Sequence, residues 1–231
     1  MKLNEIQEEI VNSNEPYIAV MAAAAAGKTA TLTERVRKML RDGVNPTDIA
    51  VITFTNMAAQ ELRERLADDY KDGIYIGTIH GLANRFLLSN GVDTSKLIEN
   101  EEFDRFFELL EENPHCIKHI KHILLDECQD TSQKEFDFIF HMIEPDTFFV
   151  VGDLRQSIYS FKGAEPKLFQ RLLNSPKVKV YDLNTNYRNG SNILAFAKTI
   201  LKKCYMDDSS IPMRQGGTVY KGPPDIKNVC T

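Results

Sequence analysis

Gly27, Lys28 and Thr29 lie between an alanine run and a helical pattern, and their groups suit phosphate binding. A phosphate loop needs backbone amides that face the phosphates, a lysine for the β- and γ-phosphates, and a hydroxyl for magnesium. A helix that starts here would add a favourable field for anions. The tripeptide alone is a weak signal, because an alanine-rich helix start is an alternative. The candidate loop comprises Ala22, Ala23, Ala24, Ala25, Ala26, Gly27, Lys28 and Thr29.

Two adjacent carboxylates, Asp126 and Glu127, follow a short apolar run at residues 123–125. In nucleotide hydrolysis the first acid of such a pair holds Mg2+, and the second orients and deprotonates the attacking water. A lone acidic pair is often only a solvated strand end. It predicts a catalytic site here because a candidate phosphate loop precedes it in the chain.

Gln156 follows the next apolar run, where a glutamine at a strand end can report whether the γ-phosphate is present. Tyr159 and Phe161 come shortly after it and could stack against nucleic-acid bases. Packing in the hydrophobic core is the alternative for both aromatic residues.

Short apolar runs alternate with longer helical patterns along the chain. Unbroken apolar strands separated by helices indicate an α/β fold whose parallel sheet is covered on both faces. Ligands of such sheets bind at the carboxyl ends of the strands, where the polar segments above fall. Phe103, Phe106, Phe107 and Leu110 predict an ordinary packed helix. The predicted strands cover residues 17–21, 49–53, 75–76, 123–126, 148–151 and 178–181, and the first three helices cover 29–40, 57–66 and a segment through residue 86.

Composition limits the class of protein. The net charge of -5 argues against a wholly electrostatic DNA binder, although motor proteins can bind DNA by stacking bases on aromatic side chains. No apolar run approaches the roughly 20 residues that span a bilayer, and the start lacks a signal-peptide layout. The four cysteines form no zinc-binding pattern. We therefore expect a cytoplasmic protein with reduced thiols and no membrane partner.

Seven segments, in order from residue 3 to residue 194, resemble the UvrD/Rep/PcrA group of superfamily-one DNA helicases. Residues 3–7 resemble the Q motif, which implies that Gln7 reads adenine. The loop resembles the family's own P-loop, which begins with alanine, but Ala23 and Ala25 stand where glycines are usual. Alanine tolerates positive φ poorly, so both residues bear on loop geometry and nucleotide affinity. The other five segments are TFTNMAAQEL (53–62), GTIHG (77–81), LDECQD (125–130), VGDLRQSIYSFKGA (151–164) and NYR (186–188).

The resemblance implies an ATP hydrolase of the DNA helicase type with ATP and Mg2+ as cofactors. Lys28 would bind the β- and γ-phosphates, Thr29 and Asp126 would hold Mg2+, and Glu127 would activate water. Gln156 and Arg188 would sense the γ-phosphate, and Tyr187 would stack on adenine. The implied contacts to single-stranded DNA are Thr53, Phe54, Asn56, Thr78, His80, Tyr159 and Phe161.

The resemblance also divides the chain. It implies a first RecA-like ATP-binding domain over residues 1–182, with a shortened helical insertion at 82–122, and an incomplete second RecA-like domain at 183–231. The family's later motifs, including an arginine that stabilises the transferring phosphate, have no counterpart in this sequence. Such an arginine is worth on the order of 10³ to 10⁵ in rate. We therefore expect this chain alone to bind nucleotide, to hydrolyse it poorly, and not to unwind DNA.

Three interpretations stay open. The chain is the front half of a complete helicase, or an ATP-binding subunit completed by a partner chain, or a non-catalytic remnant that binds DNA or protein. A nuclease partner belongs to the second interpretation, because similar compact family members occur beside a nuclease in antiphage systems. A neighbouring reading frame for the arginine-bearing lobe would favour the second, and loss of nucleotide binding the third. Translocation from 3′ to 5′ is implied by the resemblance alone.

Overall fold

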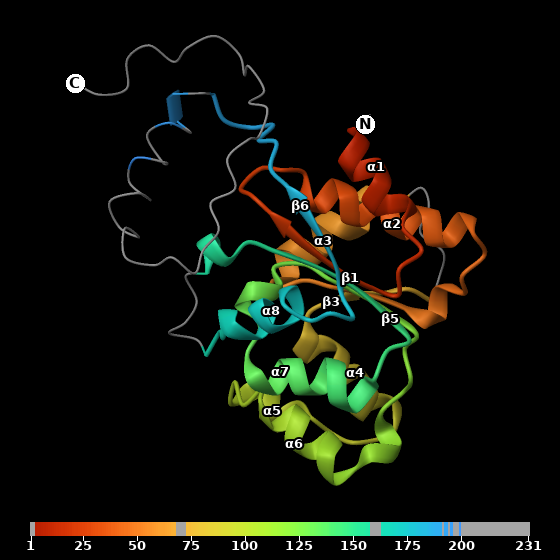
Figure 1. The fold of residues 1–231 in the computed structure, drawn as a ribbon. Helices are drawn as coiled ribbons and strands as arrows, with labels where there is room; N and C mark the ends of the chain where they lie inside the picture. The colour runs from red at the N-terminus through yellow and green to blue at the C-terminus, as the bar shows by residue number, and fades with distance from the viewer. Residues whose placement is uncertain are drawn as a thin grey trace.

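One parallel sheet forms the centre of the computed structural model (Figure 1). The structure describes residues 3–67, 73–157, 163–190, 192, 193, 195 and 199. Across these ranges the strand order is β3-β2-β4-β5-β1-β6, and all neighbouring pairs are parallel. This confirms the predicted α/β fold with a parallel sheet. The strands are β1 (Tyr17–Ala22), β2 (Ile49–Ile52), β3 (Tyr75–Gly77), β4 (His122–Leu125), β5 (Thr147–Gly152) and β6 (Lys179–Leu183).

Helices connect the strands and cover both faces of the sheet (Figure 1). Within the described ranges, none of them is long and apolar enough to cross a membrane. The α-helices are α1 (Glu5–Asn12), α2 (Lys28–Arg41), α3 (Asn56–Arg65), α4 (Ile79–Ser89), α5 (Ser95–Glu99), α6 (Arg105–Glu112), α7 (Gln133–Asp137) and α8 (Pro166–Leu173). The shorter elements are the 3-10 turns η1 (Pro46–Asp48), η2 (Pro114–Cys116), η3 (Cys128–Asp130) and η5 (Leu154–Gln156), and the π-helix η4 (Phe138–Ile143).

Alternate strand residues enter two hydrophobic cores, one on each face of the sheet. Ile49 and Val51 of β2 pack with residues of α1, α2 and α3, such as Leu32. Ile52, on the opposite face, packs with residues of α4, α6 and η4, such as Phe138. Successive side chains of a strand point to opposite faces, so a strand covered on both sides is apolar throughout. In such a strand the polar residues that follow it gather at its end, where the candidate site lies.

The segment at residues 82–122 forms a small helical layer under the sheet. Helix α6 buries Phe106, Phe107 and Leu110, which confirms the predicted packed helix for these three residues. Phe103 precedes the helix and is 40% exposed, because the chain enters α6 only at Arg105. Its ring lies 6.0 Å from the ring of His80, centroid to centroid, so it contributes to the surface beside that residue.

Strand β6 joins the sheet beside β1 and continues one residue past the predicted domain boundary at 182/183. Leu183 pairs with Ala22 in register, and the Ala23 N–H donates to the Leu183 carbonyl at 2.9 Å. Beyond the strand, the Asn186 side chain donates to the Ala24 carbonyl at 2.8 Å. The backbone up to residue 187 is thus tied to the first sheet, while the division into two domains stays a prediction.

Candidate functional site

The predicted phosphate loop joins β1 to α2 at the carboxyl edge of the sheet. The Ala26 N–H donates to the Ala23 carbonyl at 3.1 Å, and the turn closes at Gly27, whose φ is 83°. Among the described residues, no side chain caps the first turn of α2. The first N–H groups of a helix lack partners within the helix, and the helix dipole favours an anion there. The loop therefore offers its backbone donors to a phosphate group.

Ala25 is the alanine of the loop whose backbone conformation is strained. Its φ is 57°, in the left-handed region, whereas Ala23 is not among the positive-φ residues of the described chain. A side chain with a Cβ atom is strained in that region by roughly 1–2 kcal/mol. Of the two alanines that replace glycines, only Ala25 therefore imposes the expected strain.

Replacing Ala25 with glycine is expected to raise the free energy of unfolding by about 1 kcal/mol, because glycine adopts positive φ without strain. The matched control is Ala24→Gly in the same loop, where φ is not positive. That change should lower stability by about 0.5–1 kcal/mol, since glycine gains entropy in the unfolded chain. Urea unfolding without nucleotide measures both, and shifts of the same sign would contradict the assignment of strain to Ala25.

The acidic pair lies at the carboxyl end of β4, separated from the loop by the neighbouring strand β5. The Asp126 N–H donates to the Ile52 carbonyl at 2.8 Å, which extends the sheet bonding beyond β4. Glu127 turns away with a φ of 53°, and its Oε2 atom lies 2.7 Å from Lys28 Nζ. Two residues selected from separate sequence segments thus form one ion pair.

Asp126 is much more buried than Glu127. It is 8% exposed, and burial, with the neighbouring Glu127 carboxylate second, raises the pKa of Asp126 to about 6. Its Oδ1 atom accepts the Glu127 N–H at 3.0 Å. Within the described ranges, no cluster of three or more His, Cys, Asp or Glu side chains could hold a metal ion alone. Mg2+ usually takes one or two carboxylates together with substrate phosphates, so the buried carboxylate of Asp126 suits an ion that arrives with a nucleotide.

Gln129 connects the acidic pair to the next strand end, a role that the motif comparison did not indicate. Its Nε2 atom donates to Glu127 Oε2 at 3.0 Å and to Asp130 Oδ2 at 3.1 Å, while its Oε1 atom accepts the Asp153 N–H at 2.9 Å. A Cβ atom on Gly152 would lie 2.6 Å from Gln129 Oε1, so a glycine is needed at this approach. The only signal in the sequence was an amide residue between two acids.

Gln156, the predicted γ-phosphate sensor, lies on the same network. Its Nε2 atom donates to Asp153 Oδ2 at 2.8 Å. Asp153 is 2% exposed and also accepts from the backbone and side chain of Arg155. Glu127, Gln129, Asp153 and Gln156 therefore form a continuous chain of hydrogen bonds from the acidic pair to the start of the 153–157 segment.

Gln7 of α1 lies behind the loop. It is 1% exposed, its Nε2 atom donates to the Ala26 carbonyl at 3.2 Å, and its Oε1 atom accepts the Asn4 N–H at 3.0 Å. In return the Gln7 N–H donates to Asn4 Oδ1 at 2.8 Å, which completes a capping box at the start of α1. The structure thus brings Gln7 to the loop backbone.

Tyr187 reaches the same region from beyond β6. Its N–H donates to the Ala25 carbonyl at 3.0 Å, and its hydroxyl accepts from the Asn4 side chain. Asn4, which the sequence analysis did not single out, therefore connects α1 to Tyr187. Beside them is an open pocket of about 650 Å³, which is lined by Leu3, Asn4, Glu5, Ile6, Glu8, Thr185 and Tyr187.

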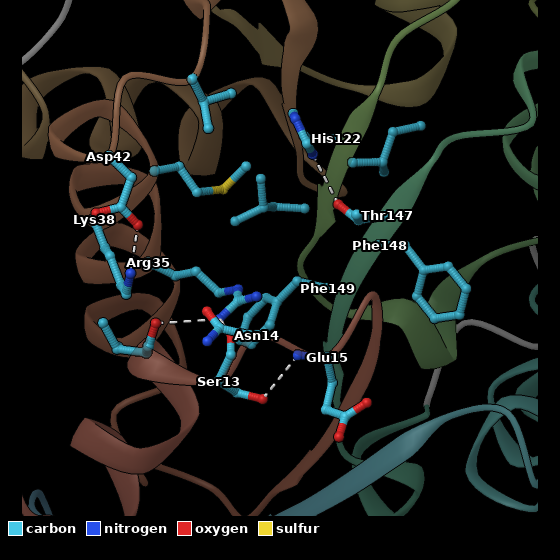
Figure 2. Close-up of a pocket in the computed structure, with 15 residues that line it drawn as sticks. Ser13, Asn14, Glu15, Arg35, Lys38, Asp42, His122, Thr147, Phe148 and Phe149 are labelled. Carbon is cyan, nitrogen blue, oxygen red and sulfur yellow. Dashed lines mark hydrogen bonds and ion pairs between the residues drawn. The ribbon is translucent and has the colours of Figure 1, made fainter.

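Arg35 of α2 anchors the other end of α1. Its Nη1 atom donates to the carbonyls of Ile10, Val11 and Ser13 at 2.9, 3.1 and 3.0 Å. The guanidinium also lies 5.3 Å from the centroid of the Phe149 ring, and burial lowers the pKa of Arg35. Figure 2 shows it at the wall of a cavity of about 180 Å³ that is also lined by residues of β4 and β5. Through this anchor, α2 fixes the helix that carries Gln7.

Replacing Arg35 with methionine is expected to lower the free energy of unfolding by about 2 kcal/mol. The methionine keeps most of the aliphatic stem, but carbonyls at the end of α1 lose a charged donor. Arg41→Met, an exposed change near the end of the same helix, is the control and should alter stability by less than about 0.5 kcal/mol. Urea unfolding measures both, and equal midpoints would contradict an anchoring role for Arg35.

Four of the predicted DNA-contacting residues line one pocket of about 630 Å³ at the carboxyl ends of β2, β3 and β4: Thr53, Phe54, Thr78 and His80. Asp126 and Glu127 line the same pocket, so the two sets of predicted residues adjoin. Asn56 is exposed at the first position of α3 and is not part of the lining. Tyr159 and Phe161 lie outside the described residues.

His80 lies between two carboxylates. Its Nδ1 atom is 3.5 Å from Glu135 Oε1, and its Nε2 atom is 3.5 Å from Asp104 Oδ1. The Phe107 ring lies 5.0 Å from the imidazole, centroid to centroid. The segment that precedes α6 and the start of α7 thus meet at His80. The sequence analysis did not predict this contact.

Arg188, the second predicted sensor, is exposed. Its backbone N–H donates to Asn186 Oδ1 at 2.9 Å. Among the described residues, no hydrogen bond or ion pair joins its guanidinium to the phosphate loop or to the acidic pair. The structure therefore assembles Lys28, Glu127 and Gln156 into one connected site but leaves Arg188 beside it.

Comparisons of the sequence with known proteins identify a family of DNA helicases. The family model of the UvrD/REP helicase N-terminal domain matches residues 3–115 and 103–177. DNA helicase II of Escherichia coli (strain K12) is 26% identical over 290 residues, which covers 87% of this chain and 40% of that protein. ATP-dependent DNA helicase Rep of the same strain is 26% identical over 291 residues, covering 87% and 43%. This chain thus spans about two fifths of the length of these curated relatives.

A solved structure shares the fold. The crystal structure of Pif1 helicase from Candida albicans superposes with a TM-score of 0.56 at 15% identity, covering 87% of this chain and 44% of that chain. At such low identity the likeness concerns the fold alone. It confirms the predicted RecA-like arrangement of the sheet and its helices.

Proposed function

Because this chain belongs to the UvrD/REP helicase N-terminal domain family, we propose that it is the part of an ATP-driven DNA motor that binds ATP with Mg2+ and single-stranded DNA. The observation that carries the proposal is the 2.7 Å contact between Lys28 Nζ and Glu127 Oε2 beside a loop with free helix donors. A lysine and an acid from distant segments meet where a terminal phosphate would be bound.

Nucleotide binding begins with an exchange of partners by Lys28. The ammonium leaves Glu127 for the β- and γ-phosphates, and the N–H groups of the loop and of the first turn of α2 complete the cradle. Thr29 and Asp126 would hold Mg2+, which would neutralise charge on the phosphate oxygens. Glu127, released from Lys28 but still bonded to Gln129, orients and deprotonates the attacking water.

Residues on either side of the phosphate loop are proposed to sense the γ-phosphate and to stack on the base. Gln156 reports the γ-phosphate, and its bond to Asp153 transmits the change to Gln129 and Glu127. Arg188, which follows Tyr187 and is exposed, is proposed to sense the γ-phosphate as well. The Tyr187 ring stacks on the base in the open pocket between α1 and residue 185.

Single-stranded DNA is proposed to cross the carboxyl edge of β2 and β3. Phe54 stacks on a base, while Thr53, Asn56, Thr78 and His80 contact the strand near it. Tyr159 and Phe161, which lie outside the described residues, belong to the same proposal. Support comes from the shared pocket, whose lining includes four of these residues and the acidic pair. DNA and nucleotide would therefore bind next to each other at the carboxyl edge of the sheet.

Whole-motor activity is proposed for these residues together with a second RecA-like lobe, of which residues 183–231 would be the beginning. The relatives named as DNA helicases are more than twice as long as the region they share with this chain. The alignment with DNA helicase II extends over 290 positions, more than the 231 residues of this chain, so it contains gaps on the side of this chain. A shortened insertion at 82–122 is part of the same proposal. Translocation from 3′ to 5′ belongs to the same proposal.

The test is binding by the intact chain. A fluorescent ATP analogue should bind saturably and more tightly with Mg2+, and a labelled single-stranded oligonucleotide should bind by fluorescence anisotropy. Phe54→Ala should weaken DNA binding by about 5- to 150-fold, since base stacking on an aromatic is worth about 1–3 kcal/mol. Phe54→Tyr keeps an aromatic face and should retain affinity. Absence of nucleotide binding, or equal DNA affinity of the Phe54→Ala chain, would contradict the respective half of the proposal.

A further inference from the structure

A cavity of about 180 Å³ lies at the amino edge of the sheet, at the end opposite the phosphate loop (Figure 2). Its walls come from the second half of α2, from the loop after α1, and from His122 and Thr147, the first residues of β4 and β5. A water molecule takes about 30 Å³ in the liquid, so the cavity has room for a small organic molecule. The proposed function makes no use of this space.

The guanidinium of Arg35 lies at the wall of the cavity with donors to spare. Its Nη1 atom donates to the carbonyls of Ile10, Val11 and Ser13 at 2.9, 3.1 and 3.0 Å. A guanidinium also has an Nε–H and an Nη2 N–H that lie parallel along one edge, the arrangement that binds a carboxylate through two hydrogen bonds. Among the residues that the structure describes, no acceptor contacts Nε or Nη2. This edge of Arg35 is therefore open to a ligand.

The charge of Arg35 is not compensated by a neighbour. Within the described ranges no carboxylate forms an ion pair with it, and Lys38, a second cation of the wall, is paired with Asp42. Figure 2 shows the exposed Glu15 carboxylate turned away from the guanidinium. Burial lowers the pKa of His122, so its ring is neutral at pH 7. The described walls thus present one unpaired positive charge.

Much of the remaining wall is apolar. Val11, Met39, Val44 and Leu124 line the cavity, and the Phe149 ring lies under the guanidinium. Small-molecule sites combine apolar walls with a few polar groups that fix the orientation of the ligand. One pair of parallel donors beside apolar walls matches a planar carboxylate on an apolar body. Inorganic phosphate matches less well, because it carries more than one negative charge at pH 7 and has no apolar surface.

We propose that this cavity binds a small organic monocarboxylate. The carboxylate accepts two parallel hydrogen bonds from Nε and Nη2 of Arg35, and the apolar body packs against Met39 and Val44. Nη1 keeps its bonds to the end of α1, so the anchoring role of Arg35 is unchanged. The cavity and the phosphate loop lie at opposite edges of the sheet, and the inference therefore stands independently of the proposed function.

Isothermal titration calorimetry of the unmodified chain with benzoate and benzamide tests the recognition of a carboxylate. The two probes share the ring and differ in the charged pair of oxygens. We expect benzoate to bind with a dissociation constant of roughly 1 mM or tighter, and benzamide to bind at least about tenfold more weakly. Equal affinities of the two probes, or no saturable binding of benzoate at about 20 mM, would overturn the inference.

Two variants test the location of the ligand. Arg35→Lys keeps a cation but removes the parallel donors, so benzoate affinity should fall at least about tenfold. Arg41→Lys, an exposed change on the same helix, is the matched control and should retain the affinity. Val44→Phe fills the cavity without changing Arg35 and should abolish saturable binding. Unchanged benzoate affinity in Val44→Phe would overturn the inference, and this variant decides the question if Arg35→Lys does not fold.

Lys28→Met separates the cavity from the phosphate loop, where an anion could also bind. Benzoate affinity should be the same in this chain as in the original, because the loop lies at the other edge of the sheet. Loss of benzoate binding would place the anion at the loop and overturn the inference. Inorganic phosphate, titrated into the same variant, should bind more weakly than benzoate, and the reverse order would overturn the choice of a carboxylate.

Discussion

The Asp126→Asn chain is expected to be more stable than the original by about 3 kcal/mol at pH 7.5 without ligand. Burial raises the pKa of Asp126 to about 6, compared with about 3.9 for an unfolded aspartate. Below pH 4 both states carry the proton and Asp126 has no effect. Between pH 4 and 6 the unfolded state ionises first, so stability falls as pH rises. Above pH 6 a shift of about two units leaves a constant cost of about 3 kcal/mol, which asparagine removes.

Urea unfolding at pH 4 and pH 7.5 measures this effect. The gain should be large at pH 7.5 and nearly absent at pH 4, whereas Glu111→Gln, an exposed change on α6, should alter stability little at either pH. A gain of the same size at both pH values would contradict a titration origin. The same substitution should weaken binding of Mg2+ with ATP, because the buried carboxylate is retained for its ligand at a cost in stability.

The Lys28→Met chain is expected to bind ATP about 10- to 150-fold more weakly, because hydrogen bonds to charged groups contribute about 1.5–3 kcal/mol. The Lys28 side chain is 11% exposed, so it is already held close to the site before a nucleotide arrives. Methionine keeps a stem of similar length and removes only the ammonium that would bind the phosphates. Titration with a fluorescent ATP analogue measures the change.

Two variants control this experiment. Lys38→Met removes a lysine of the same helix that pairs with Asp42, away from the loop, and should leave ATP affinity unchanged. Glu127→Gln removes the carboxylate that competes with phosphate for Lys28, so ATP affinity should stay equal or rise. Equal affinities of the Lys28→Met and original chains would sink the assignment of Lys28 to the phosphates.

Much of the fold followed from local patterns. The IAVI run of β2 is apolar at every position because both faces of the strand are covered, and such runs separated by helices predicted the parallel sheet. The rule that parallel strands present their carboxyl ends at one edge then placed Lys28 and Glu127 near each other. These inferences succeed because the apolar pattern of a strand is visible in a few consecutive residues. The direction of parallel strands then fixes the edge of the sheet at which each strand ends.

The tertiary structure decided which groups of the site are free and which are already occupied. The sequence determined the parallel sheet and indicated the phosphate loop and the acidic pair, from local patterns and from their order along the chain. It did not determine that Gln129 bridges Glu127 and Asp153, that the amide of Gln7 bonds to Asn4 and Ala26, or that His80 lies between Glu135 and Asp104. Hydrogen-bond partners and burial depend on segments that are distant in the chain and meet only when the sheet and its helices pack together.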